Sequence, residues 1–172
     1  MEFSASLDPQ ARRITWMVHG MIALVLVFWA DSYLEPGGIS AAGIWYLFLP
    51  IFPLYAYFLL RRPLGYRLLN DRLELLRPLG SRHILLQDIV RCESVSEDCI
   101  RSSRRRLGMD GFHGYYGRYR HPRLGLLQSQ ATRLDSLILL ELRSGERIVI
   151  SPDRPGEFLR NCSPEPAGPL PV

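Results

Sequence analysis

Two long apolar runs without a formal charge lie in the first third of the chain and constrain its fold most strongly. The first run, Ile14–Ala30, has 17 residues, and the second, Ile39–Leu60, has 22. A helix needs about 20 apolar residues to cross a hydrocarbon core roughly 30 Å thick, so the second run is long enough and the first is adequate with its flanks. No small-x-small cleavage site follows the first run, which argues against a signal peptide. We therefore expect a 1–62 segment with transmembrane helices at about 14–33 and 39–60.

The charges that flank the two runs predict their orientation. Arg12 and Arg13 precede the first run, and Arg61 and Arg62 follow the second, whereas the connecting DSYLEPGG carries two carboxylates and no arginine. Because an excess of arginine marks the cytoplasmic side, the runs should form a hairpin with both termini cytoplasmic. His19 is the one titrating candidate inside them, and we interpret it as a neutral histidine bonded to backbone or to the other helix.

From residue 63 onward the pattern changes to short alternating runs broken by turn residues, which predicts a small β domain over 63–162. The expected strands are Tyr66–Leu69, Arg72–Arg77, Arg82–Leu86, Ile89–Val95, Leu124–Ala131, Leu134–Leu142 and Glu146–Ile150. Their close spacing leaves no room for crossover helices, so the sheet should be antiparallel. A short helix after Ser151-Pro152-Asp153, which offers capping side chains, should close the domain. The last ten residues, 163–172, contain four prolines and are expected to be a disordered tail.

The segment RRRLGMDGFHGYYGRYR, residues 104–120, has a glycine at every third position between two arginine clusters. Its spacing fits no phosphate-binding glycine motif, and it contains no proline that would suggest a collagen-like repeat. We interpret it as a long irregular connection whose glycines supply positive φ and close backbone approach. Phe112 and two tyrosines should pin it onto the domain, with Tyr116 outside. The residues expected to shape this connection are Gly108, Gly111, Gly114, Gly117, Tyr115 and Tyr119.

Several segments of the β region resemble the bacterial PH-like domains of small membrane proteins. They are YRLLNDRLELL, ILLQDIVRCESV, RRLG, GYYGRYR, ATR and ISPDRPGEF, and they cover Gly65 to Cys162. The resemblance implies an α+β membrane protein of the bacterial inner membrane, in which a helix hairpin precedes a mostly antiparallel PH-like β-barrel or sandwich with a C-terminal helix. The chain departs from the family pattern at two places. Its Glu97–Arg106 loop is unusually basic, and Leu127-Gln128-Ser129 stands where an aromatic residue is expected.

The chemistry-bearing residues indicate no enzyme. No nucleophile elbow, H-E-x-x-H or P-loop is present, the four histidines are scattered, and the three cysteines lack the spacing of a zinc site. We therefore predict no catalytic residues, no cofactor and no metal. Residues 61–172 hold 19 arginines and 13 carboxylates, a surplus that suits a membrane surface or an acidic partner. A membrane tether argues against nucleic acid, although arginines near tyrosines are suitable for it.

Two functions remain. The first is a membrane-anchored interaction or accessory module that binds a membrane-protein partner or another copy of itself. The second is a sensor of anionic lipid headgroups that uses the arginines of 101–106. Either function predicts contacts from one set of arginines: Arg61, Arg62, Arg67, Arg101, Arg104, Arg105, Arg106, Arg118 and Arg120. Those at the inner leaflet gain about 1 kcal/mol each from anionic lipid.

Overall fold

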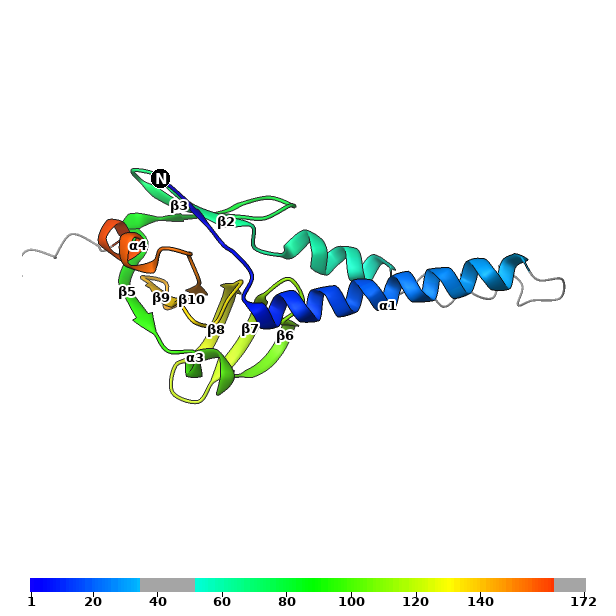
Figure 1. Ribbon diagram of the computed structural model, residues 1–172. Coiled ribbons are helices and arrows are strands. Elements are labelled where there is room, and N and C mark those ends of the chain that lie inside the picture. The colour runs from blue at the N-terminus through cyan, green and yellow to red at the C-terminus, as the bar shows by residue number, and fades with distance from the viewer. Residues whose placement is uncertain (35–51, 163–172) are drawn as a thin grey trace, which may run out of the picture.

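The computed structural model describes residues 1–34 and 52–162, which form a β domain with one long projecting helix (Figure 1). This helix, α1 (Pro9–Leu34), starts at the domain and extends well beyond it. Residues 52–61 are also helical and return beside the half of α1 that is nearer to the domain. The predicted first span lies within α1. Residues 39–51 of the predicted second span and the predicted tail, 163–172, lie outside the described residues.

The strands form two sheets that face each other across the domain (Figure 1). The first sheet has the order β1-β2-β3-β4, with the bounds β1 (Glu2–Ser4), β2 (Gly65–Leu68), β3 (Arg72–Leu76) and β4 (Arg82–Leu85). The second sheet has the order β5-β9-β10-β8-β7-β6, with the bounds β5 (Ile89–Val95), β6 (Arg104–Asp110), β7 (Tyr115–His121), β8 (Gly125–Ala131), β9 (Leu137–Leu142) and β10 (Arg147–Ile150). The short helices are η1 (Leu86–Asp88), α3 (Asp98–Arg101) and α4 (Pro155–Cys162). All seven predicted strands and the closing helix are therefore confirmed, with bounds that differ by a few residues.

Alternating apolar side chains from the two sheets meet in a core between them. Leu73 and Leu75 of β3 face inward and are almost fully buried, as the alternation predicts. The core between the sheets also contains Tyr66, Ile138, Leu140, Ile148, Ile150 and, from α4, Phe158. Tyr66 joins the two sheets by hydrogen bonds, because its hydroxyl donates to Gln130 O at 2.6 Å and accepts from Ser151 N–H at 3.1 Å.

The second sheet departs from the expected antiparallel pairing at one position. β10 pairs antiparallel with β9 but parallel with β8, with Ile150 opposite Gln130. β10 turns back from β9 and inserts between β9 and β8, so it runs in the direction of β8. Spacing along the chain indicates hairpins, but it carries no information about which strand enters between two others.

The glycine-rich segment is a hairpin of two strands, so the expectation of an irregular connection is wrong. β6 and β7 pair antiparallel, with Gly108 opposite Gly117. Both glycines have positive φ, and a Cβ on Gly108 would lie 2.1 Å from Tyr116 O, so a side chain at this position would strain the pairing of the two strands. The prediction that Tyr116 lies outside is also wrong, since its side chain is buried.

The N-terminus contributes a strand that the sequence did not predict. β1 pairs with β2 at the edge of the first sheet, and Phe3 of β1 packs against Phe158. Asp153, expected to cap α4, instead accepts the Ser6 N–H at 3.1 Å. Ser151 Oγ, the other expected cap, accepts the Thr132 N–H at 2.8 Å. The contacts of β1 and Ser6 fasten the segment that precedes α1 to the domain.

Candidate functional site

The base of α1 is held to the domain by a polar cap. Asp8 Oδ1 accepts the Ala11 N–H at 2.6 Å, as an N-cap side chain does, and Pro9 occupies the first helical position. Tyr115 of β7 donates its hydroxyl to the same Asp8 oxygen at 3.4 Å. Ala11 is completely buried in a second apolar cluster with Tyr115 and Tyr119. The direction in which α1 leaves the domain is therefore fixed by buried contacts.

A cluster of rings joins α1, the helix of residues 52–61 and the turn between β6 and β7. His19 Nδ1 donates to Thr15 O at 2.7 Å, so its Nε2 is the acceptor for the Tyr55 hydroxyl at 3.0 Å. His19 is therefore bonded both to backbone and to the other helix, as expected from the sequence. In the turn, the His113 N–H donates to Thr15 Oγ1 at 2.9 Å, and the Phe112 ring lies 6.0 Å from that of His19.

His113 of this cluster is held in its neutral form. Arg62 Nη1 donates to His113 Nδ1 at 3.3 Å. Burial, followed by the charges of Arg62 and His19, lowers the pKa of His113 to about 4. Within residues 1–34 and 52–162, no group of three or more histidine, cysteine, aspartate or glutamate side chains is placed to hold a metal ion.

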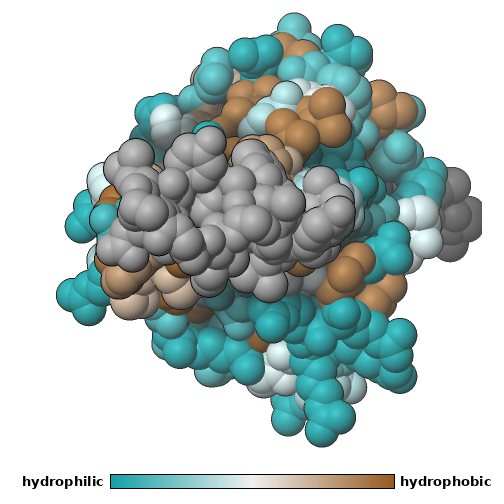
Figure 2. All heavy atoms as spheres, turned by 90° about the vertical axis from the view of Figure 1, so that its right-hand side faces the viewer, coloured by the Kyte–Doolittle hydropathy of each residue, from teal (hydrophilic) through white to brown (hydrophobic). Residues whose placement is uncertain are grey.

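On its other side, α1 carries large apolar side chains that are exposed. Pro9–Phe28 is the one stretch of the described helices that is long and apolar enough to cross a membrane, and only 11% of its most apolar 18 residues is buried. Trp16, Met21, Leu24 and Phe28 are all more than half exposed. Seen from the side on which α1 projects, the surface of the domain is mostly hydrophilic with separate hydrophobic areas (Figure 2).

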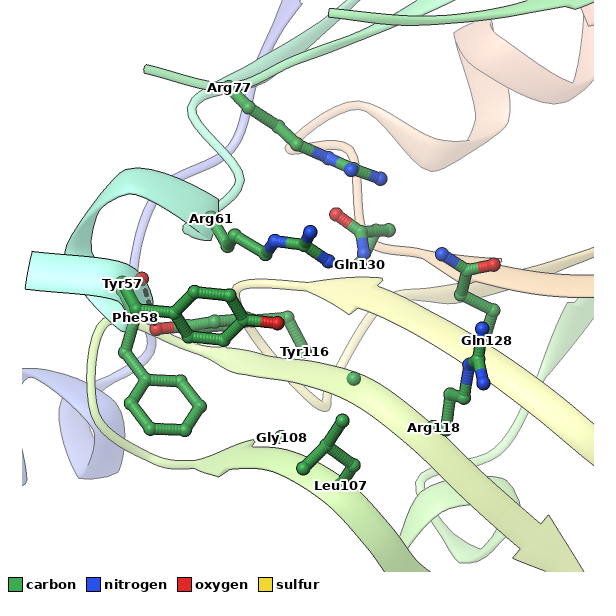
Figure 3. Close-up of a pocket in the computed structure, with 11 residues that line it drawn as sticks. Tyr57, Phe58, Arg61, Arg77, Leu107, Gly108, Tyr116, Arg118, Gln128 and Gln130 are labelled. Carbon is green, nitrogen blue, oxygen red and sulfur yellow. Dashed lines mark hydrogen bonds between the residues drawn. The ribbon is translucent and has the colours of Figure 1, made fainter. Parts of the chain in front are cut away.

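A pocket of about 250 Å³ lies where the helix of residues 52–61 meets the two sheets (Figure 3). Tyr57, Phe58 and Arg61 come from the end of that helix, and Arg77 follows β3. The remaining lining residues belong to β6, β7 and β8: Leu107, Gly108, Tyr116, Gly117, Arg118, Gln128 and Gln130. The Tyr116 hydroxyl donates to Phe58 O at 2.8 Å and so joins β7 to the helix at the pocket.

The pocket is basic, and its arginines form no ion pair with a carboxylate of residues 1–34 or 52–162. Its lining has three arginines and no acidic residue. Figure 3 shows Arg61 and Arg77 pointing toward Gln130, and Arg118 pointing toward Gln128. Burial, followed by the charges of Arg82 and Arg61, lowers the pKa of Arg77. Nε and Nη2 of Arg77 are buried and have no hydrogen-bond partner within the described part of the chain.

Two glutamines complete the polar wall of the pocket. Arg82, paired with Glu146 at 2.6 Å, also donates to Gln128 Oε1 at 2.7 Å. This bond orients the Gln128 amide, so its nitrogen lies on the side of the pocket (Figure 3). Gln130 is only 5% exposed, and its Oε1 has no donor among the described residues.

The arginines expected from the sequence to make contacts are distributed over several surfaces. Arg61 and Arg118 line the pocket, and Arg62 binds His113. Arg67 pairs with Glu2 at 3.4 Å, and Arg101, on α3, pairs with Glu97 at 2.9 Å. The other four are exposed on β6 and β7, where Arg104 lies opposite Arg120: Arg104, Arg105, Arg106 and Arg120.

Arg77, Gln128 and Gln130 are among the pocket residues that were not predicted from the sequence. Arg77 stands at the end of a strand before Pro78, a position at which an arginine is ordinarily solvated. Gln128 and Gln130 are two apart in β8, so the period of a strand places them on the same face. That spacing was the one feature of the sequence that could have suggested a shared polar surface. It does not show a pocket, because the opposite wall comes from distant parts of the chain.

The comparisons with known proteins agree with this architecture. The family model described as "Bacterial PH domain" matches residues 64–164, from the start of β2 to just beyond α4. No curated protein and no solved structure matches the chain. The match covers more than half of the sequence. It includes every pocket residue that comes from the β domain, but not Tyr57, Phe58 and Arg61 of the preceding helix. The chain therefore belongs to the bacterial PH domain family.

Proposed function

We propose that the protein is a non-enzymatic interaction module, anchored in the bacterial inner membrane, whose PH domain is held against the cytoplasmic face. There it binds another membrane protein or a second copy of itself. PH domains are generally non-catalytic interaction modules that bind lipids or proteins, and this supports the proposal. The observation that carries it is the fixed base of α1 combined with its exposed apolar length.

The exposure of α1 is what distinguishes an anchor from an internal helix. A core helix of a soluble protein buries most of its apolar side chains, whereas only 11% of the most apolar 18 residues of α1 is buried. An exposed helix with side chains such as Leu24, Val27 and Phe28 is costly in water but stable in lipid. The second apolar run, Ile39–Leu60, would return the chain across the same bilayer, in agreement with Arg61 and Arg62 at its end.

A fixed helix also sets where the domain lies. Because the cluster of His19, Tyr55 and His113 joins both helices to the domain, the domain cannot rotate freely about a linker. We infer that the same face of the domain always meets the membrane surface. A module of this kind presents one fixed surface to a lateral partner, which reduces the orientational freedom lost on binding.

Extraction from membranes tests the anchor. The full chain should stay in the membrane pellet after alkaline carbonate treatment, and a reporter at either terminus should be accessible from the cytoplasm only. A Leu24→Arg variant should insert less well, because arginine at a helix centre costs about 2.5–3.5 kcal/mol on insertion scales. Arg160→Gln on α4 is the control and should remain in the pellet. Release of the unchanged chain by carbonate would refute the anchor.

In-cell crosslinking followed by capture from membranes tests the partner. The chain should be recovered with a neighbouring membrane protein or as a crosslinked multimer. A strict monomer in detergent that retains no neighbour after crosslinking would refute the interaction module.

Binding of anionic lipid by the arginines of 101–106 is a second candidate. It is favoured by Arg104, Arg105 and Arg106, which are exposed on edge strand β6 and form no ion pair within the described residues. Changing these three to glutamine should then weaken binding to anionic vesicles, and salt should weaken binding of the unchanged chain. Equal binding by the triple variant would exclude this surface.

A further inference from the structure

We propose that Cys92 and Cys162 form a redox site, at which a hydroperoxide such as hydrogen peroxide converts the two thiols into an intrachain disulfide. The disulfide would join the last residue of α4 to β5, the edge strand of the second sheet. This inference goes beyond the proposed function and does not depend on the membrane anchor, since both cysteines belong to the β domain.

The two cysteines come from elements that are far apart in the chain but adjacent in the fold. Cα atoms of α4 and β5 lie within 8 Å of each other (Figure 1). Cys162 comes four residues after Phe158, so the helical period places both on one face of α4, and both are buried in the core between the sheets. Cys92 lies opposite Leu140 of β9 and packs against the same core. The fold therefore brings both side chains to one part of the core.

The two thiols contact each other directly. The Cys162 thiol donates a hydrogen bond to the sulfur of Cys92. This bond lowers the pKa of Cys92 against the opposing effect of burial. The same bond, followed by burial, raises the pKa of Cys162. The pair therefore contains one sulfur that ionises more readily than an ordinary thiol and one that keeps its proton.

The exposure of the two side chains divides their roles in the same way. Cys92 is only partly buried and lies on an edge strand, whereas Cys162 is 3% exposed. A small oxidant from solvent therefore meets Cys92 first. Because the thiolate and not the thiol is the nucleophile, Cys92 is the sulfur that attacks the peroxide. Cys162 is the resolving thiol, which lies next to the oxidised product.

The oxidation proceeds in two balanced steps. In the first, the Cys92 thiolate attacks one oxygen of hydrogen peroxide, so an S–O bond forms and the O–O bond breaks. The hydroxide that leaves takes up the proton lost by Cys92 and becomes water. In the second, the Cys162 sulfur attacks the sulfur of the Cys92 sulfenic acid, the S–S bond forms and the S–O bond breaks. The hydroxide leaves with the Cys162 proton as water, so the thiols lose two electrons in all to the peroxide.

The remaining cysteine provides a contrast within the same domain. Cys99 lies on α3 and is buried in the second apolar cluster with Tyr115 and Tyr119. Burial, followed by the charge of Glu93, raises the pKa of Cys99. We therefore expect Cys99 to remain a thiol where the pair is oxidised, and its replacement is the matched control.

A disulfide at this site would fix the closing helix. Phe158 of α4 packs against Phe3 of β1, with the ring centroids 5.2 Å apart, so α4 also holds the strand that precedes α1. A crosslink between β5 and α4 restricts the unfolded chain and stabilises the folded domain. Oxidation should therefore strengthen the end of the domain opposite the projecting part of α1 (Figure 1).

The experiment uses the full chain in neutral detergent, reduced with dithiothreitol, freed of it and then treated with hydrogen peroxide. Peptide mapping by mass spectrometry identifies any disulfide, maleimide labelling counts the free thiols, and dimedone traps sulfenic acids. Thermal unfolding is measured before and after oxidation. The variants are Cys92→Ala, Cys162→Ala and the control Cys99→Ala.

We expect the unchanged chain to lose two of its three thiols and to yield a peptide pair linked through Cys92 and Cys162. Its Tm should rise by about 8 °C or more, and dithiothreitol should reverse both changes. Cys99→Ala should respond in the same way. Cys162→Ala should instead accumulate a dimedone adduct on Cys92, and Cys92→Ala should form neither product. If a variant does not fold, the peptide map of the unchanged chain still decides, because it needs no substitution.

Three results would overturn the site. They are a map without the linked pair after peroxide treatment, a disulfide that includes Cys99, and crosslinks between chains in place of the intrachain bond. Equal dimedone labelling of Cys92 and Cys99 in the Cys162→Ala variant would refute the role of Cys92 as the nucleophile. Carbonate extraction of the reduced chain is independent of these thiols, so failure of this site leaves the anchor standing.

Discussion

The hydroxyl of Tyr66 is predicted to hold the two sheets together, and its removal gives the sharpest test of the fold. Tyr66 is completely buried, and burial raises its pKa to about 12, so it is a neutral donor and acceptor at any physiological pH. It donates to Gln130 O of the second sheet and accepts the backbone N–H of Ser151, which follows β10. Tyr66→Phe keeps the ring and deletes both bonds.

The magnitude follows from what is left behind. The Ser151 N–H becomes a buried donor without a partner, at a cost of about 1–3 kcal/mol, and the bond to Gln130 O contributes a further 0.5–1.5 kcal/mol or so. The free energy of unfolding should therefore fall by about 2–4 kcal/mol. For a domain of this size, 1 kcal/mol shifts Tm by about 4–8 °C, so Tm should fall by at least about 8 °C.

The assay is thermal unfolding of the full chain in detergent, followed by far-ultraviolet circular dichroism. Tyr57→Phe is the matched control, because the Tyr57 hydroxyl makes no hydrogen bond within the described residues and its ring still faces Arg61. This control should change stability by no more than about 0.5 kcal/mol. A Tyr66→Phe variant as stable as Tyr57→Phe would refute the role given to the hydroxyl.

Three further predictions concern the β6–β7 hairpin. Gly114→Ala should destabilise the domain by at least about 1 kcal/mol more than the control Gly125→Ala. Both glycines have positive φ, but only a Cβ at Gly114 would meet a backbone oxygen, Ala131 O, at 2.7 Å. Equal melting temperatures of the two variants would contradict this. Arg105→Gln should leave Tm within the range of ordinary surface changes, about 0.5 kcal/mol, and a large loss would show that this arginine is structural. The folded-state pKa of His113, about 4, lies below its unfolded value near 6.5, so the unfolded chain binds the extra proton and stability should fall by up to about 3 kcal/mol from pH 6.5 to pH 4. His113→Asn, a residue that tolerates the positive φ at this site, should flatten the Tm profile between pH 7 and pH 5, and an unchanged slope would assign the loss to other groups.

Local pattern was enough to predict most of the secondary structure. Ile89–Val95 is a strand with the predicted bounds, and Arg72–Leu76 agrees to within one residue, because apolar alternation and turn residues act within a few positions. The glycine-rich segment misled for a physical reason. Glycine lowers strand propensity, but here Gly108 and Gly117 face each other and permit two backbones to approach within a distance that no Cβ allows.

The candidate site was predictable only in part. Arg61 and Arg118 were among the arginines expected to make contacts, but nothing in the sequence indicated that they line the same pocket. Arg77 and Gln130 have buried polar atoms with no hydrogen-bond partner within the described residues, and neither residue was predicted. What distinguishes them is the lack of a partner for a buried atom, which depends on every side chain that surrounds it and on no feature of its own neighbourhood in the chain.

The sequence by itself determined that the chain has an apolar N-terminal part, a β domain of the PH class and a closing helix, because hydrophobic runs, alternation and turn residues are local properties of the polymer. The tertiary structure alone decided that β1 joins the first sheet, that β10 enters parallel beside β8, and that His19 meets both Tyr55 and the β6–β7 turn. It also brought Arg61, Arg77 and Arg118 together around one cavity. These are contacts between residues far apart in the chain, and they are selected by the packing of the whole core, which no short window of sequence contains.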